Sequence, residues 1–177
     1  MLITDDILKE AQPAAQKIKN FDGKIRLIGQ YDADGINASA IAHKPLERLG
    51  KDFEYEILKQ LYEEDIERIA DESEELLLFV DIGSGQSDLI KEHILNETGK
   101  NIIISDHHEP ALEKEDSEEE ENLVHMNPHF LGHDGGEAIS AAGMTYLLAK
   151  AIDEDNQDLV KYALVGATGD VQKQEGE

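Results

Sequence analysis

Two short apolar runs limit what this chain can fold into more than any other feature. Leu76–Val80 contains no polar side chain, and Asn101–Ser105 carries three consecutive isoleucines at its centre. Strands that are apolar on both faces are typical of parallel sheets covered by helices on both sides. Ile25–Gln30 and Phe53–Leu58 also have the pattern of strands, and helical patterns lie between successive strands. The order βαβαβαβ therefore predicts an α/β fold, a parallel sheet with helices on both faces.

The residues between these strands predict where helices begin and end. Gly35 opens the turn into a helix of small residues, and Pro45 should kink or restart that helix. The segment 135–148, which is entered through two glycines, should form one helix. Residues 113–122 are mostly acidic and should form a solvated loop, because like charges repel one another.

Length and composition set the broad class of the protein. With 177 residues and 40% hydrophobic content, the chain is expected to form a single domain over residues 1–177. No apolar run is long enough to span a membrane, and the first residues lack the pattern of a signal peptide, so a cytoplasmic protein is expected. The sequence has no cysteine, so oxygen and imidazole would have to hold any metal, which favours Mn²⁺ or Mg²⁺.

Short acidic motifs lie where the predicted strands and helices end. In chain order they are Asp32-Ala33-Asp34-Gly35, Asp81-Ile82-Gly83, Asp106-His107-His108 and Gly169-Asp170. The first three follow predicted strands, and ligands of open α/β sheets bind beyond the carboxyl ends of the strands. Carboxylates and imidazoles from separate elements would therefore meet at one edge of the sheet.

These residue types match the needs of a hydrolytic metal site. Hard divalent cations prefer carboxylate oxygen, imidazole suits Mn²⁺, and two ions about 3.5–4 Å apart can share a carboxylate and a hydroxide. Asp32 and Asp34, two apart on an extended segment, would point the same way and could serve different ions. Asp81 could bridge the ions and His107 could bind the second one. His108 would remain free to donate a proton or to steady a phosphate.

Each motif taken alone also has a purely structural explanation. An Asp-x-Asp-Gly segment is commonly a turn, and here Lys44 and Pro45 fall where a calcium loop would need a ligand. Asp81 or Asp170 alone could be a helix cap. The ordered set, with two adjacent histidines after a buried strand, favours convergent ligands and hence a metal-dependent phosphoesterase.

The ordered motifs resemble those of the DHH phosphoesterase superfamily. The segment Ser105-Asp106-His107-His108-Glu109-Pro110, followed by Asn127-Pro128-His129, is similar to the RecJ-like single-strand nuclease branch, in particular its archaeal replication-associated members. The resemblance implies an N-terminal DHH domain with two Mn²⁺ ions, or Mg²⁺ in their place. The metal ligands that it implies are Asp32, Asp34, Asp81, His107 and Asp170.

The same resemblance implies roles for the residues around the metals. His108 would lie beside the scissile phosphate, Asp106 would orient His107, and Asp81 would serve the reaction through the ions it bridges. His129 would lie at the rim of the site. Apart from the resemblance, the free backbone N–H groups of Gly135 and Gly136 could bind a phosphate, although the pattern favours a packing helix with a glycine-rich entry.

The chain departs from this family pattern at two points. Gln30 stands where relatives carry His or Asp; it could merely cap the strand, or its amide oxygen could still bind a metal, more weakly than a carboxylate does. The first metal position is therefore expected to be weakened. The smaller C-terminal domain of the family, which supplies much of the substrate groove, is also expected to be missing.

These observations favour an exonuclease that hydrolyses single-stranded DNA or RNA ends. The formal charge of −24 argues against broad binding of phosphate backbones by this chain alone, so single-stranded nucleic acid would bind through the missing domain. Alternative activities on the same chemistry are hydrolysis of pyrophosphate, short oligonucleotides or cyclic dinucleotides. The alternative from another class is a non-catalytic scaffold with a protein partner in a replication complex; no membrane association is expected.

Overall fold

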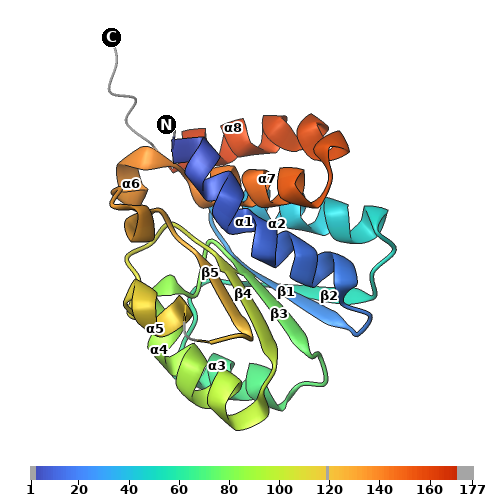
Figure 1. Cartoon of the computed structure of the whole chain (residues 1–177), viewed down its shortest axis with the longest axis vertical. Helices are drawn as coiled ribbons and strands as arrows, with labels where there is room; N and C mark the ends of the chain where they lie inside the picture. The colour runs from blue at the N-terminus through green and yellow to red at the C-terminus, as the bar shows by residue number, and fades with distance from the viewer. Residues whose placement is uncertain (1–2, 119, 171–177) are drawn as a thin grey trace.

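The computed structural model describes residues 3–118 and 120–170. Its centre is a five-stranded sheet in the order β2-β1-β3-β4-β5, and every neighbouring pair is parallel (Figure 1). The strands are β1 (Ile25–Gln30), β2 (Phe53–Leu58), β3 (Leu76–Val80), β4 (Asn101–Ser105) and β5 (Leu123–Met126). The predicted α/β fold with a parallel sheet is confirmed.

Helices cover both faces of the sheet, as predicted. The helical elements are α1 (Ile3–Asn20), α2 (Ala33–Arg48), α3 (Glu63–Asp71), η1 (Ser84–Gln86), α4 (Ser87–Ile90), η2 (Lys91–Asn96), α5 (Lys114–Glu118), η3 (Pro128–Leu131), α6 (Gly135–Ala138), α7 (Ala141–Ile152), η4 (Glu154–Leu159) and α8 (Val160–Gly169). Figure 1 shows α1, α2, α7 and α8 on one side of the sheet and α3 and α4 on the other.

Strand β3 divides the core into two layers. Leu76, Leu78 and Val80 pack into the cluster formed with α1, α2 and α7, whereas Leu77 and Phe79 pack into the cluster formed with α3, α4 and η2. This alternation follows from the period of two of a β-strand. Each of these side chains is at most 1% exposed, and burial of one such side chain contributes about 1.5–3 kcal/mol.

The strand register brings the chain segments of three motifs to one edge of the sheet. Gly29 pairs with Val80, and Val80 pairs with Ser105. The residues that follow these positions, Gln30, Asp81 and Asp106, therefore lie at the same level of this edge.

Helix α2 differs from its prediction at both ends. It begins at Ala33, because the Asp32 side chain accepts a hydrogen bond from the Gly35 N–H at 2.9 Å and so caps the helix. Asp34 thus lies in the first turn of a helix, and the extended segment expected for Asp32 and Asp34 is wrong. The expected restart at Pro45 is also wrong: the proline lies in the last helical turn, so the helix runs unbroken past it to Arg48.

The segment 135–148 forms two helices where one was predicted. Ile139 and Ser140 are extended between α6 and α7, and the Ser140 side chain accepts a hydrogen bond from the Gly143 N–H at 3.2 Å. A capping serine starts a new helix because it satisfies a backbone N–H that the first turn leaves open. The break leaves the N-terminus of α7 free to contact other parts of the chain.

Part of the predicted acidic loop is helical. Lys114–Glu118 forms the short helix α5, with Glu115 and Asp116 in its first turn. Acidic side chains at this position interact favourably with the positive end of the helix dipole, which offsets their mutual repulsion. Residue 119 of the predicted loop lies outside the described residues.

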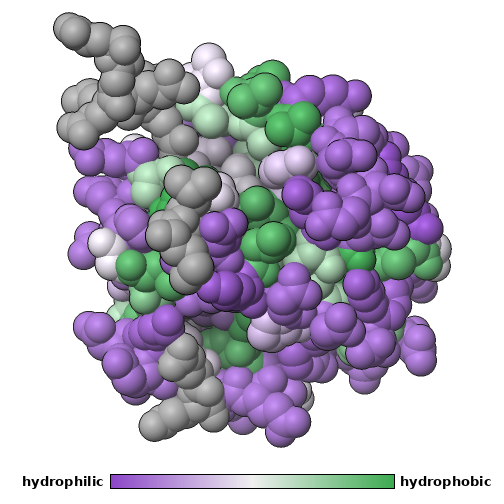
Figure 2. Space-filling model, turned by 45° about the horizontal axis from the view of Figure 1, so that its top comes forward, coloured by the Kyte–Doolittle hydropathy of each residue, from purple (hydrophilic) through white to green (hydrophobic). Residues whose placement is uncertain are grey.

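The surface is strongly hydrophilic. Hydrophilic residues cover most of the face that Figure 2 shows, in keeping with the formal charge of −24. Large apolar side chains that stay exposed include Tyr31, Leu164 and Val165. Among the described helices, none combines the length and the apolar character needed to cross a bilayer.

Candidate metal centre

The four motifs converge at the carboxyl edge of the sheet. The carboxyl ends of β3 and β4, the first turn of α2 and the residue after α8 each bring acidic or imidazole groups to this edge. Two overlapping groups have potential ligand atoms within 4.8 Å of one another: Asp34, His107 and Asp170, and Asp81, Asp106, His107 and His108. His107 belongs to both groups and forms the centre of the site.

The His107 ring is oriented by a backbone carbonyl. Its Nδ1 lies 3.0 Å from the Gly135 oxygen, and its Nε2 lies 3.5 Å from Asp81 Oδ1 and 3.9 Å from Asp34 Oδ2. Because a carbonyl can only accept, Nδ1 carries the proton that it donates to Gly135. In the neutral ring the lone pair of Nε2 faces the carboxylates, which is the orientation a metal ligand needs.

The Asp34 carboxylate is held by the N-terminus of α7. Its Oδ2 accepts a hydrogen bond from the Ala141 N–H at 2.7 Å, and its Oδ1 accepts one from the Ala142 N–H at 3.1 Å. Burial raises the pKa of Asp34, although these backbone N–H groups lower it in part. Bonds from a helix start thus fix a buried carboxylate beside His107.

Asp81 occupies a strained backbone position directly after β3. Its φ is +59°, in the left-handed region that residues with a side chain rarely adopt. Its Oδ1 is buried and has no hydrogen-bond partner among the described residues. Burial, together with the charges of Asp34, Asp106 and Asp32, raises the pKa of Asp81 to about 7, although the neighbouring His107 lowers it in part.

The surroundings of His107 favour its protonated form in the protein alone. Burial lowers the pKa of His107, but the Asp81 carboxylate and the Gly135 carbonyl outweigh burial and raise it to about 9. A divalent cation would displace that proton and supply the missing positive charge. The orphaned Asp81 oxygen and the donor set of carboxylates with imidazole therefore fit a hard divalent ion.

Asp106 contacts the ring of His108, although the resemblance implies that it orients His107. Its Oδ1 lies 2.7 Å from His108 Nδ1 and accepts the backbone N–H groups of His107 at 2.7 Å and His108 at 3.3 Å. Burial raises the pKa of Asp106, but the His108 ring and the Ser84 N–H outweigh it and leave the pKa well below its usual range. The hydrogen bond to Asp106 raises the pKa of His108. Asp106 thus positions the His108 ring and favours its protonated form.

The family of the chain is evident from sequence comparison. The DHH family, N-terminal domain, matches residues 24–169. The chain belongs to the DHH family. An uncharacterized protein of Methanocaldococcus jannaschii is 38% identical over 170 residues, which are 94% of this chain and 37% of that protein. The DHH domain described here therefore spans well under half the length of that relative.

Proteins named RecJ are also similar to this DHH domain. The single-stranded-DNA-specific exonuclease RecJ of Bacillus subtilis is 27% identical over 171 residues, which are 93% of this chain and 21% of that protein. The structure of RecJ from Thermus thermophilus in complex with Mn²⁺ is 28% identical with a TM-score of 0.72, over 94% of this chain and 24% of that one. The predicted resemblance to the DHH superfamily and its RecJ-like branch is confirmed.

Gln30 and Asp32 lie beside the second group of this DHH site but are not part of it. With its amide oriented to donate, Gln30 gives hydrogen bonds to Asp32 Oδ2 at 2.8 Å and to Asp81 Oδ2 at 3.1 Å. The other Asp32 oxygen caps α2 through Gly35. Asp32 is therefore close to the centre, and protein N–H groups occupy both of its oxygens.

The predicted rim residues His129, Gly135 and Gly136 lie next to His107, and Gly135 contacts it directly. The Gly135 N–H donates to His129 Nε2 at 3.3 Å, and the Gly136 N–H donates to Asp134 Oδ1 at 2.9 Å. Both N–H groups thus have partners within the protein, and a role for them in binding phosphate stays a prediction. The carbonyl of Gly135, which the sequence did not single out, is the group that orients His107.

Other supporting residues were missed by sequence reasoning. The Ser84 N–H donates to Asp106 Oδ2 at 2.9 Å, and Asn127 Nδ2 donates to the His108 carbonyl at 2.8 Å. A Cβ at Gly166 would collide with Asp34 Oδ1, so this glycine lets α8 approach the site. The available signals were the Asn-Pro-His segment and the glycine three residues before the Gly-Asp motif.

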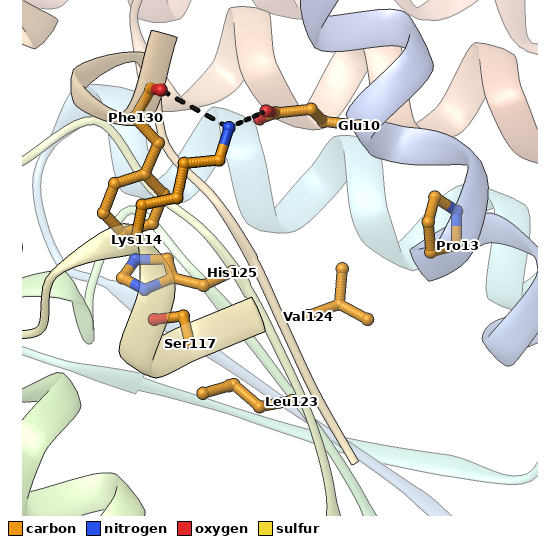
Figure 3. Close-up of a pocket in the computed structure, with 8 residues that line it drawn as sticks. All are labelled: Glu10, Pro13, Lys114, Ser117, Leu123, Val124, His125 and Phe130. Carbon is orange, nitrogen blue, oxygen red and sulfur yellow. Dashed lines mark hydrogen bonds and ion pairs between the residues drawn. The ribbon is translucent and has the colours of Figure 1, made fainter. Parts of the chain in front are cut away.

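A separate pocket lies between α1, α5 and β5 (Figure 3). It has a volume of about 200 Å³, and Lys114 reaches across it to Glu10 and to the Phe130 carbonyl. His125 forms part of its wall, and burial lowers the pKa of this histidine to about 4. None of its described lining residues belongs to the metal centre, so this pocket is separate from the candidate chemistry.

Proposed function

We propose that this DHH domain hydrolyses phosphodiester bonds in single-stranded nucleic acid with the help of divalent metal, Mn²⁺ in the first place. The observation that carries the proposal is the buried set of Asp34, Asp81 and His107, in which the ring nitrogen faces both carboxylates and Asp81 Oδ1 has no hydrogen-bond partner among the described residues. Metal bound there would activate a water molecule and neutralise charge on the phosphoryl oxygens.

The protein residues would hold and orient the metal. Asp34, His107 and Asp170 would form one binding position, and Asp81 would bind from the side that faces His107 Nε2. The Gly135 carbonyl keeps the proton of His107 on Nδ1, so that Nε2 stays available. Asp32 would contribute only if its contact with Gln30 were released.

His108 would act on the substrate directly. Its side chain is 47% exposed, whereas the other groups around His107 are largely buried. Since Asp106 raises its pKa, the protonated ring is favoured and would hold a phosphate oxygen or donate a proton to the leaving oxygen. Ser84 and Asn127 would support this role by holding the segment around His108 in place.

The substrate class rests on the relatives and on the charge of the domain. The RecJ relative in Bacillus subtilis is a single-stranded-DNA-specific exonuclease. The formal charge of −24 disfavours broad contact with duplex backbones, which fits action on strand ends held by other parts of a longer protein. Both DNA and RNA ends are candidate substrates.

A replication-complex scaffold without catalysis is the second candidate. The neutral Gln30 amide between Asp32 and Asp81 favours it, because an amide donor there opposes metal binding on that side. The complete set of Asp34, His107 and Asp170 on the other side favours an enzyme.

Cleavage assays separate these functions. End-labelled single-stranded DNA and RNA, pyrophosphate and a cyclic dinucleotide are each incubated with the protein and Mn²⁺ or EDTA. We expect Mn²⁺-dependent release of label from a single strand, and a loss of more than about 100-fold in Asp81→Asn, since even outer partners of metal ligands typically cost 10–100-fold. Asp88→Asn, at an exposed position in α4, is the matched control. Preferred hydrolysis of pyrophosphate or the cyclic dinucleotide, or no hydrolysis at all, would contradict the proposal.

A further inference from the structure

The side chain of Gln30 takes the place that a cation would take between two carboxylates. Its amide nitrogen lies 2.8 Å from Asp32 Oδ2 and 3.1 Å from Asp81 Oδ2. The opposite orientation would set the amide oxygen against both carboxylates and leave its N–H groups without acceptors, so the donating orientation is the favourable one. One neutral amide thus joins two acidic residues that would otherwise repel each other.

A metal ion on this side would have to displace the amide. The nitrogen of a carboxamide does not bind hard cations, because its lone pair is delocalised into the carbonyl, and such cations bind oxygen. The Gln30 oxygen could face an ion only after the amide turned over, which would break both hydrogen bonds. Asp32 has little freedom to compensate, because its Oδ1 accepts the Gly35 N–H at 2.9 Å and starts α2.

The Asp81 oxygen that faces His107 is not blocked by a side-chain amide as Oδ2 is. Asp81 Oδ1 faces His107 and has no hydrogen-bond partner among the described residues. The N–H groups that bind Asp34 are backbone groups at the start of α7. A cation can therefore bind beside His107 without displacing a side-chain amide such as that of Gln30.

We propose that Gln30 is a specificity-determining residue for metal number, which closes the Asp32 side so that the chain binds one divalent ion per molecule. The bound ion lies on the side of Asp34, His107 and Asp170, and Asp81 completes it through Oδ1. This inference rests on the metal centre of the proposed function, but it does not depend on nuclease activity. It differs from the two-ion site that the family resemblance implies.

The number of bound metal ions tests the inference without any substrate. The protein is freed of metal with EDTA, and Mn²⁺ is titrated by calorimetry. Electron paramagnetic resonance shows whether the bound Mn²⁺ ions are isolated or magnetically coupled. We expect one ion per chain with an uncoupled Mn²⁺ spectrum. Gln30→Asp replaces the donor by a ligand and should bind two ions with the spectrum of a coupled pair. Gln60→Asp, at an exposed position, adds the same charge away from the site and should still bind one.

A second variant guards against a folding defect. Gln30→Ala removes the amide without adding a charge, and it should gain a second ion at least tenfold weaker than the first. Far-UV circular dichroism confirms the fold of each variant. Two ions in the unchanged protein would overturn the inference, and so would one ion in both Gln30→Asp and Gln30→Ala. No bound ion in any of the proteins would overturn the metal centre itself and with it the proposed function.

Discussion

At the scale of single residues, the centre depends on groups that the rest of the chain leaves without ordinary partners. Asp81 combines a left-handed backbone with a buried oxygen that has no hydrogen bond among the described residues. Strain and an orphaned acceptor both cost stability, and they persist where surrounding structure enforces them. Metal binding would recover part of that cost.

Metal binding should release the protons that Asp81 and His107 hold in the metal-free protein. In the metal-free protein the pKa of Asp81 is about 7 and that of His107 is about 9, both above their ordinary values. Below these values the groups hold protons that the metal must displace, so Mn²⁺ affinity should rise as the pH increases from about 6 to about 9. Calorimetry in buffers of different ionisation enthalpy measures the released protons. Equal affinity and no release across this range would contradict the assignment.

Gly166 should be required for the position of Asp34. In Gly166→Ala the new Cβ would collide with Asp34 Oδ1 and with the Ala142 side chain. Overpacking of this kind costs about 1–3 kcal/mol, and we expect a lower melting temperature together with at least tenfold weaker Mn²⁺ binding. Gly85→Ala is the control, because its Cβ would meet only the Glu109 carbonyl at 3.9 Å. Unchanged Mn²⁺ affinity in Gly166→Ala would show that Asp34 does not need this close approach.

At the scale of elements, helix α7 links the core to the metal centre. Its N-terminal N–H groups bind Asp34, while Met144 and Leu148 on the same helix are buried in the core. Ser140 defines where this helix starts, and so it determines which N–H groups face Asp34.

Removal of the Ser140 cap should therefore affect stability and metal binding together. Ser140→Ala loses the hydrogen bond from the Gly143 N–H, and loss of a serine cap costs about 1 kcal/mol. We expect a lower urea midpoint and weaker Mn²⁺ binding, while Ser73→Ala, at an exposed bend, should change neither. A stability loss with full Mn²⁺ affinity would mean that Asp34 is held without the correct start of α7.

Local sequence patterns predicted the strands that have a continuous apolar run and the motifs that follow them. The continuous apolar run of Leu76–Val80 could only be a strand buried on both faces, and the acidic motifs marked the ends of such strands. Helix α1 and strand β5 were not predicted. Strand β5 has only four residues, of which Val124 and His125 are partly exposed, so it lacks a clear apolar pattern.

Long-range contacts explain what the sequence could not predict within the site. Asp34 is bound by an N–H group 107 positions away, and His107 by a carbonyl 28 positions away. Backbone groups have no sequence signature, because every residue carries them. The motifs therefore predicted which side chains would meet, while their orientation came from packing of α7 and α6.

At the scale of the whole molecule, the sheet concentrates acidic groups at one edge of an already acidic protein. The chain carries 40 acidic and 16 basic residues, and Asp34, Asp81, Asp106 and Asp170 come together around His107. A concentration of negative charge in a buried site is unfavourable without a counter-ion. Membership of the DHH family and likeness to RecJ in complex with Mn²⁺ agree with a divalent metal as that counter-ion.

The most direct measurement is an anomalous difference map from a crystal of the protein soaked in Mn²⁺. We expect a peak bounded by Asp34, Asp81 and His107, with Asp170 on its outer side, and no peak of equal height between Gln30 and Asp32. The same crystal form of Asp81→Asn should show a weaker peak or none. A well-ordered crystal at millimolar Mn²⁺ with no anomalous peak beside His107 would contradict the metal centre.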